Sequence, residues 1–194
     1  MNTQRMRKIK NLYFGYEEIA RVLGITYGSA RVTASRYVKQ GLLVRVKRNL
    51  YVLRERWDNM DEESFFVIAN IAQVPSYISL MTALDYYGVT TQMQRNFTES
   101  VAIKRTREIQ ADDRIFAYSK VRRELYFGFV KERGFFIASP EKALADALYL
   151  KSVAAYNFDT TSISTGRLNR KSLQRVCGFF PKNTRELAGK YGYI

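Results

Sequence analysis

The sequence predicts an α+β protein with two modules, a small basic module of helices and one hairpin followed by a larger mixed module. Helical periodicity gives way to strand alternation near residue 43, and aromatic and β-branched residues dominate residues 97–138. Residues 1–56 contain 13 of the 32 Lys and Arg but only 3 of the 18 Asp and Glu, which is +10 of the net charge of +14. This asymmetry indicates binding to nucleic acid or to an anionic membrane.

Three helices are expected at the start of the first module. The first is a basic helix over residues 3–13. The second, "YEEIARVLG" at residues 16–24, has two glutamates in its first turn, where they favour the helix dipole, and Gly24 at its end. Thr26 is expected to cap the third helix, which Gly41 ends.

A β-hairpin is expected next, in "LLVRVKRNLYVL" at residues 42–53. Val44 and Val46 alternate with basic side chains, which predicts a strand with one apolar and one basic face. Asn49 tolerates a left-handed backbone and fits the turn, although glycine is the residue we would expect there. Helix, helix, short turn, helix and hairpin is the order of a winged helix-turn-helix domain, which we expect over residues 1–56.

The third helix is expected to expose a basic face without a carboxylate. Ala30, Ala34 and Tyr37 fall on one side at 100° per residue, and small, hydroxylated and basic residues fall on the other. A helix fits the DNA major groove, where its N-terminal residues meet base edges, while other contacts go to phosphates. The candidates for base contacts are Tyr27, Ser29, Arg31, Val32 and Ser35, and those for phosphate contacts are Arg36, Lys39, Arg45, Lys47 and Arg48. A solvated helix face or a protein-docking winged helix is the alternative.

The second module, residues 57–194, is expected to be a mixed α+β domain with a small sheet covered by helices. Its strands are expected within residues 97–138, and Pro140 opens a helix that follows them. Further helices are expected at 61–72, 79–87, 170–176 and 184–191. The near-balanced charge and separate apolar segments suggest that residues 60–194 fold without the first module.

Residues 64–84 carry no charge over a length that would span a membrane. Pro75 and several polar side chains interrupt this stretch, so we interpret it as two buried helices. The basic N-terminus lacks the apolar core of a signal peptide, and Cys177 is the only cysteine. A cytoplasmic protein that makes no use of a membrane is therefore expected.

Catalytic residue types are scarce. The chain has no histidine, which removes the commonest neutral base and zinc ligand, and Cys177 alone cannot build a thiolate metal site. There is no Gly-x-x-x-x-Gly-Lys loop for phosphates, and Asp112 and Asp113 fit a solvated turn. Lys142 and Asp146, four residues apart, fit an exposed ion pair or a buried tether better than a catalytic pair. No enzyme, cofactor or metal site is expected.

Three segments together resemble a known family. They are "FGYEEIARVLGITYGSARVTASRYVKQGLLVRVKRNLYVL", "PSYISLMTALDYYGVT" and "GFFIASPEKALADALYL". Their order and spacing are similar to those of AbiEi-type antitoxins of type IV toxin–antitoxin systems, over most of residues 10–151. The resemblance implies an N-terminal winged helix that binds inverted repeats in the protein's own promoter and represses its operon. It also implies a C-terminal domain that counteracts a nucleotidyltransferase toxin without requiring a stable complex.

Within the second module, the polar-tipped side chains in the resembling segments are the candidates for antitoxin function. They are Tyr77, Tyr86, Tyr87, Lys142 and Asp146. Core packing with internally bonded hydroxyls is the alternative for these five. At the level of the whole chain, the alternatives are a stand-alone regulator or RNA-binding protein with a ligand-sensing C-terminal domain, or an interaction scaffold. The oligomeric state and the operator sequence stay open.

Overall fold

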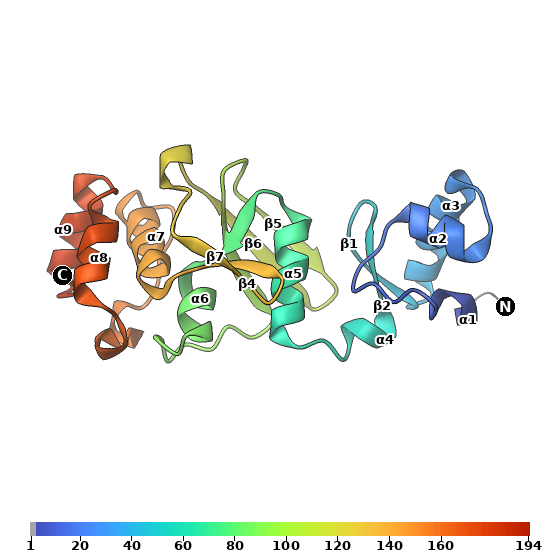
Figure 1. Ribbon diagram of the computed structural model, residues 1–194, viewed down its shortest axis with the longest axis horizontal. Helices are drawn as coiled ribbons and strands as arrows, with labels where there is room; N and C mark the ends of the chain where they lie inside the picture. The colour runs from blue at the N-terminus through green and yellow to red at the C-terminus, as the bar shows by residue number, and fades with distance from the viewer. Residues whose placement is uncertain (1–2) are drawn as a thin grey trace.

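Two layered bodies share one β-hairpin in the computed structural model, which describes residues 3–194 (Figure 1). The termini lie at opposite ends of the long axis, with α1 to α3 at one end and α8 and α9 at the other. The elements are α1 (Thr3–Met6), α2 (Tyr16–Leu23), α3 (Tyr27–Lys39), β1 (Leu43–Lys47), β2 (Leu50–Leu53), α4 (Arg54–Trp57), α5 (Glu62–Ala72), β3 (Ser76–Ile78), α6 (Leu80–Tyr86), β4 (Phe97–Ala102), β5 (Arg107–Ala111), β6 (Arg114–Lys120), η1 (Arg123–Leu125), β7 (Phe129–Glu132), β8 (Phe135–Ala138), α7 (Pro140–Ser152), η2 (Thr160–Ser162), η3 (Thr165–Arg167), α8 (Arg170–Cys177) and α9 (Lys182–Lys190).

The N-terminal body has the predicted helix-turn-helix. Gly24 and Gly41 follow α2 and α3 with φ of 68° and 70°, a left-handed conformation that glycine adopts without steric cost. The Thr26 hydroxyl accepts a hydrogen bond from the Ser29 N–H at 3.2 Å and caps α3. The predicted ends of α2 and the predicted cap of α3 are therefore confirmed.

The prediction of a helix over residues 3–13 is wrong beyond Met6, where α1 ends. Further along, Phe14 exchanges backbone hydrogen bonds with Tyr51 at 3.0 and 2.9 Å, so it lies as an extended segment beside β2. This pairing with the hairpin fixes Phe14 in an extended conformation, a tertiary constraint that local periodicity does not reveal.

The turn of the hairpin explains why asparagine occupies position 49. Asn49 has φ of 60°, as the sequence predicts, and its Oδ1 accepts the Tyr16 N–H at 2.6 Å. Tyr16 is the first residue of α2, so the side chain satisfies a backbone donor that the helix itself leaves free. Asn49 thus joins the hairpin turn to the start of α2, a bond that glycine could not make.

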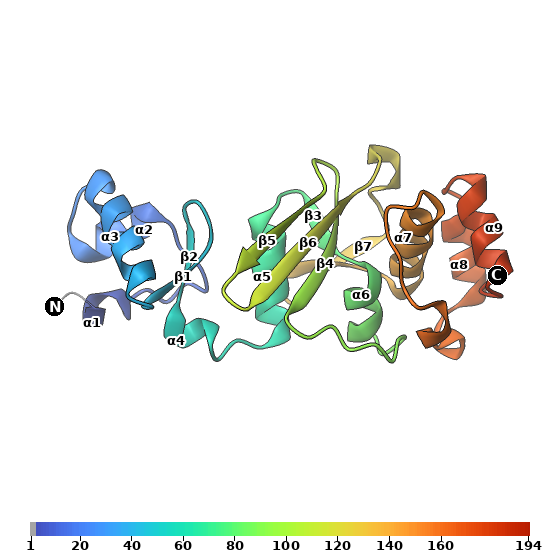
Figure 2. The same ribbon diagram turned by 180° about the vertical axis from the view of Figure 1, so that it is seen from behind.

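The second body contains a six-stranded mixed sheet in the order β5-β6-β4-β3-β8-β7. Its two parallel pairs are β3 with β8 and β4 with β6, and the other pairs are antiparallel. Figure 2 shows the sheet from the side opposite α5, which covers the other face. Helices α6 and α7 pack together beside β4 and β8, and α8 and α9 pack on the far side of α7 (Figure 1).

The expected fold class is confirmed, with one strand that the sequence did not reveal. All five helices expected in the second module are present, as α5, α6, α7, α8 and α9, within a few residues of the predicted ends. Strand β3 lies between the two helices predicted in residues 64–84. A continuous run of apolar residues has the same pattern in a buried strand and in a buried helix, so the sequence does not distinguish them. Among the described residues, no helix is long and apolar enough to span a bilayer.

The hairpin is the layer that the two bodies share. Leu43 and Tyr51 belong to the core of the first body. The side chains of Val44, Val46, Leu50 and Val52 belong instead to the large core of the second body. The strands therefore bury apolar side chains on both sides. The sequence predicts that residues 60–194 fold alone, but residues 44–52 contribute side chains to the core of that part of the chain.

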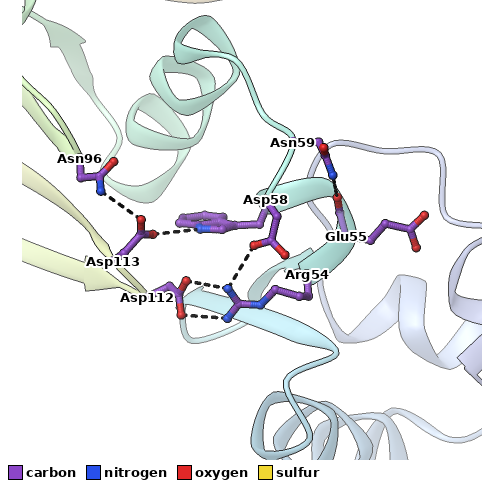
Figure 3. Close-up of polar contacts among 8 residues, drawn as sticks. Arg54, Glu55, Asp58, Asn59, Asn96, Asp112 and Asp113 are labelled. Atoms are coloured by element: carbon purple, nitrogen blue, oxygen red, sulfur yellow. Dashed lines mark hydrogen bonds and ion pairs between the residues drawn. The ribbon is translucent and has the colours of Figure 1, made fainter.

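Polar contacts between α4 and the turn that joins β5 to β6 also hold the two bodies together (Figure 3). The Arg54 guanidinium donates to both carboxylate oxygens of Asp112 at 2.6 and 2.8 Å, a bidentate geometry, and also to Asp58 at 3.3 Å. The neighbouring Asp113 accepts from the Trp57 indole at 3.5 Å and from Asn96 at 3.1 Å. The expected exposed turn at Asp112 is present, and it binds α4.

Candidate nucleic-acid interface

Helix α3 presents the predicted face to solvent. Ala30 and Ala34 are fully buried and Tyr37 nearly so, which fixes the rotation of the helix on its core. Of the outward side chains, Tyr27 is 52% and Val32 70% exposed, values that are high for large apolar groups. The five proposed base-contacting side chains, Tyr27, Ser29, Arg31, Val32 and Ser35, are all exposed.

A hollow of about 860 Å³ separates α3 from the hairpin. We call it the α3–hairpin groove; it is lined by Tyr16, Arg31, Val32, Ser35, Arg36, Val38, Lys39, Arg45, Arg48 and Tyr51. Five of these residues are basic and none is acidic. None of the five basic side chains takes part in an ion pair within residues 3–194. The groove thus concentrates unneutralised positive charge between a helix and a strand, where an anionic backbone would be attracted.

Two tyrosines form the floor of the groove, which the sequence did not single out. The Tyr51 hydroxyl donates to the Tyr16 hydroxyl at 3.1 Å, and burial together with this bond raises the pKa of Tyr51 well above its ordinary value. Tyr16 also meets the ring of Tyr27 edge to face, with centroids 5.5 Å apart. This contact fixes the ring that projects at the start of α3.

Lys47 does not line the groove with the other basic candidates. Its Nζ donates to the carbonyl oxygens of Ile71 and Ala72, each at 3.0 Å, at the C-terminal end of α5. Burial, and then the charges of Arg107 and Lys104, lower the pKa of Lys47. The assignment of Lys47 to a DNA phosphate is therefore corrected, because its ammonium group is held against the second body.

The second body brings three of the five candidate antitoxin residues together. Tyr77 donates to Asp146 Oδ2 at 2.9 Å and accepts from Lys142 Nζ at 2.8 Å, and Lys142 also bonds Asp146. Ser79 completes the cluster with a 2.9 Å bond to the same carboxylate oxygen. All four residues are fully buried, so the alternative of a buried tether describes Lys142 and Asp146.

Burial controls the electrostatics of this cluster. Desolvation lowers the pKa of Lys142 and raises that of Asp146, and their mutual attraction acts against both changes. Gly128 has φ of 71°, and a Cβ there would come within 3.0 Å of the Lys142 side chain. The site is closely packed around the pair, so these side chains have no access to solvent.

Tyr86 and Tyr87 lie elsewhere, between α6 and β7. Tyr86 donates to Glu63 at 3.1 Å and to Glu132 at 3.3 Å, and Tyr87 donates to Glu132 at 3.4 Å. Burial and these carboxylates raise the pKa of each tyrosine to about 12. Their hydroxyls are bonded internally, and both rings are only partly buried.

No group of three or more metal-ligand side chains occurs within residues 3–194. The α3–hairpin groove, with its five basic side chains, is suited to binding an anionic partner by charge and shape.

Three helices, a short turn and a basic hairpin define a winged helix-turn-helix domain, here followed by a mixed α+β domain. Residues 10–54 match the family model described as "Transcriptional regulator, AbiEi antitoxin". The resemblance found in the sequence is thus confirmed over that segment. A comparison with curated protein sequences gives no significant match.

The fold also has a solved counterpart. The crystal structure of the RV2827C protein from Mycobacterium tuberculosis matches with a TM-score of 0.61 and 12% sequence identity. The match covers 97% of this chain and 74% of the mycobacterial chain. At this identity the likeness concerns the fold, and it extends over both bodies.

Proposed function

We propose that this protein is a DNA-binding transcriptional repressor of its own operon and the antitoxin of a type IV toxin–antitoxin system. The α3–hairpin groove, with five basic side chains and no carboxylate, carries the DNA-binding half of this proposal. The family match over residues 10–54 supports both halves. The expected toxin is a nucleotidyltransferase encoded by a neighbouring gene, and the opposition need not involve a stable complex.

In this proposal, α3 enters the major groove and the hairpin follows the adjacent backbone. Arg31 is placed to donate two hydrogen bonds to a guanine, and the exposed Val32 to contact a thymine methyl group. Arg36, Lys39, Arg45 and Arg48 would hold phosphates and set the register of the helix. Their exposure and freedom from ion pairs support these roles.

The DNA-binding half is tested with the full chain and a labelled duplex from the region upstream of its own gene. We expect specific binding, and we expect a Lys39→Ala/Arg45→Ala/Arg48→Ala variant to lose most of it. A matched Lys171→Ala/Arg175→Ala/Lys190→Ala variant removes the same charge from α8 and α9 and should bind normally. Equal loss in both variants would contradict a role for the groove.

The antitoxin half is tested by co-expression with the neighbouring gene. We expect the neighbour to be toxic alone and harmless with this protein, and we expect the groove variant to keep protection while losing repression. Growth and promoter activity are scored in the same cells, with protein levels checked. Absence of toxicity from any neighbour would instead indicate a stand-alone regulator.

A further inference from the structure

A second hollow, of about 1030 Å³, lies at the C-terminal end of α3. Side chains from α1, from the last turn of α3 and from α4 line it, and these three helices lie close together in Figure 2. We call it the α1–α3–α4 pocket. Its volume is close to the upper end of the range of roughly 300–1,000 Å³ in which proteins bind small molecules. It is therefore large enough for a small-molecule ligand.

One part of the α1–α3–α4 pocket is apolar. Met6 and Tyr37, which belong to the core of the first body, line it. Leu42 and Leu53 also line it and are only partly buried against that core. An aromatic ring or an alkyl chain in the pocket would cover these side chains and remove apolar surface from water, which favours binding.

The charged part of the pocket contains three arginines, of which two already have a carboxylate partner. Arg7 is paired with Glu55 at 3.1 Å. Arg54 is paired with Asp112 at 2.6 Å. The third, Arg36, is exposed and forms no ion pair within residues 3–194. The pocket therefore offers one uncompensated positive charge beside an apolar wall, which is complementary to a ligand with one negative charge and an apolar body.

Arg36 belongs to two hollows at once. It lines the α3–hairpin groove as well as the α1–α3–α4 pocket. Its guanidinium carbon lies 5.7 Å from the centre of the Tyr37 ring, which forms part of the apolar wall of the pocket. A guanidinium that is bonded to an anion in the pocket is not free to hold a phosphate in the groove. Occupation of the pocket and binding of DNA therefore oppose each other, and each weakens the other by the same factor.

We propose that the α1–α3–α4 pocket binds a small amphipathic carboxylate, aromatic or aliphatic, and that this ligand releases the protein from DNA. The carboxylate accepts hydrogen bonds from Arg36, and the apolar body covers Tyr37, Leu42 and Leu53. The regulatory half of this inference rests on the proposed DNA binding, whereas the binding of the ligand does not. The ligand would act on the first body itself, through a side chain that the proposed DNA complex needs.

Binding of the ligand is tested on the full chain by isothermal titration calorimetry. The probes are octanoate and 1-naphthaleneacetate, and 1-naphthaleneacetamide is the uncharged counterpart of the second probe. The variant is Gln40→Glu, which places a carboxylate of nearly the same shape in the pocket, one helical turn from Arg36. The control variant, Gln174→Glu, adds the same charge to an exposed position of α8. Circular dichroism and thermal unfolding check that both variants are folded.

We expect the unmodified protein and the control to bind one equivalent of 1-naphthaleneacetate about tenfold more tightly than the amide, because the amide lacks the charge that strengthens the hydrogen bonds to Arg36. Gln40→Glu and Arg36→Ala should each abolish this preference for the carboxylate. A labelled promoter duplex is then titrated with and without saturating 1-naphthaleneacetate. The ligand should weaken DNA binding by the unmodified protein and the control, and should leave that of Gln40→Glu and Arg36→Ala unchanged.

Other outcomes separate the inference from the proposed function. If neither carboxylate binds, or if Gln40→Glu keeps the preference for the carboxylate, the inference is overturned, and the proposed function stands where the promoter duplex is bound. If the carboxylate binds but leaves the affinity for DNA unchanged, release from DNA is overturned. If the unmodified protein does not bind its promoter, the proposed function fails, and the titrations with the two probes still decide whether the pocket is a ligand site.

Discussion

At the scale of single residues, Arg31 is the side chain that best distinguishes a contact with a DNA base from a contact with a phosphate. It lies on the exposed face of α3 and lines the groove. Arg31→Ala should cost about 1–3 kcal/mol on the specific site, because it removes two hydrogen bonds to a base, and much less on random DNA. Binding to both duplexes is compared by fluorescence anisotropy.

Arg36→Ala provides the matched comparison, since this arginine lines the same groove and is assigned to a phosphate. It should weaken binding to both duplexes by a similar factor. If Arg31→Ala also weakens both equally, Arg31 holds the backbone and does not read a base.

The buried pair of Lys142 and Asp146 supports a prediction about stability. Removing one partner leaves an uncompensated buried charge, so Lys142→Met and Asp146→Leu should each cost about 3–5 kcal/mol in the free energy of unfolding. The double variant should be less destabilised than the two single effects together predict, because no buried charge remains. Denaturant unfolding of the four proteins measures this coupling.

The same four proteins separate a structural from a functional role. A structural role predicts that the double variant, where it is folded, protects against the toxin. A folded double variant without protection would show that the pair, or Tyr77 bonded to it, contributes directly to antitoxin function.

At the scale of elements, the turn of the hairpin depends on two properties of Asn49. Its backbone is left-handed and its side chain accepts the Tyr16 N–H. Asn49→Gly keeps the left-handed backbone but loses the hydrogen bond, which should lower the free energy of unfolding by about 0.5–1.5 kcal/mol. Asn49→Ala loses the same bond and should lower it by about 1–2 kcal/mol more, because alanine is strained in this conformation. The expected order of thermal stability is wild type, Gly variant, Ala variant. A Gly variant as stable as wild type would show that the bond to α2 contributes nothing.

The elements of the first body were largely predictable because their signals are local. Thr26 and Gly24 mark ends of helices by capping chemistry, and the spacing of Ala30 and Ala34 fixes the buried side of α3. Lys47 was misassigned because strand alternation places it on the same face as Arg45. In the structure the register shifts between Arg45 and Lys47, as at a β-bulge, and Lys47 pairs with Leu50, whose side chain belongs to the second core. Lys47 therefore lies against the second body.

The second body was predictable in kind but less so in detail. Lys142 and Asp146 have a spacing that suits an exposed pair and a buried pair equally, so the sequence left both open. Tyr77 in β3 bonds to Lys142 and Asp146 in α7, two segments that meet only in the folded chain. Non-local pairing of this kind leaves no pattern within either segment.

At the scale of the whole molecule, the ion pair at the junction predicts a pH dependence. The Arg54 guanidinium holds the pKa of Asp112 below its ordinary value of 3.8. The unfolded chain therefore binds more protons near pH 4 than the folded chain, so the contribution of the pair is present above pH 3.8 and lost as pH falls through the lower folded value. The stability difference between wild type and Asp112→Asn should shrink across that range in denaturant unfolding. A difference that is constant with pH would contradict this role.

The shared hairpin predicts that the two bodies unfold together. An isolated fragment of residues 1–56 would expose Val44, Val46, Leu50 and Val52, which the second core otherwise covers, so we expect it to be less stable than the same residues in the full chain. Trp57 is the only tryptophan and lies buried at the junction, 5.0 Å from the ring of Phe65.

The fluorescence of Trp57 therefore reports on the contact between the bodies, while far-ultraviolet circular dichroism reports on all helices and strands. The two thermal transitions of the full chain should coincide, as they do in a cooperative unit. Val46→Ala, which thins the shared layer, should lower both midpoints together. Two separated transitions, or a shift in the fluorescence transition alone, would show that the bodies unfold independently and that the groove is not held in a fixed orientation to the second domain.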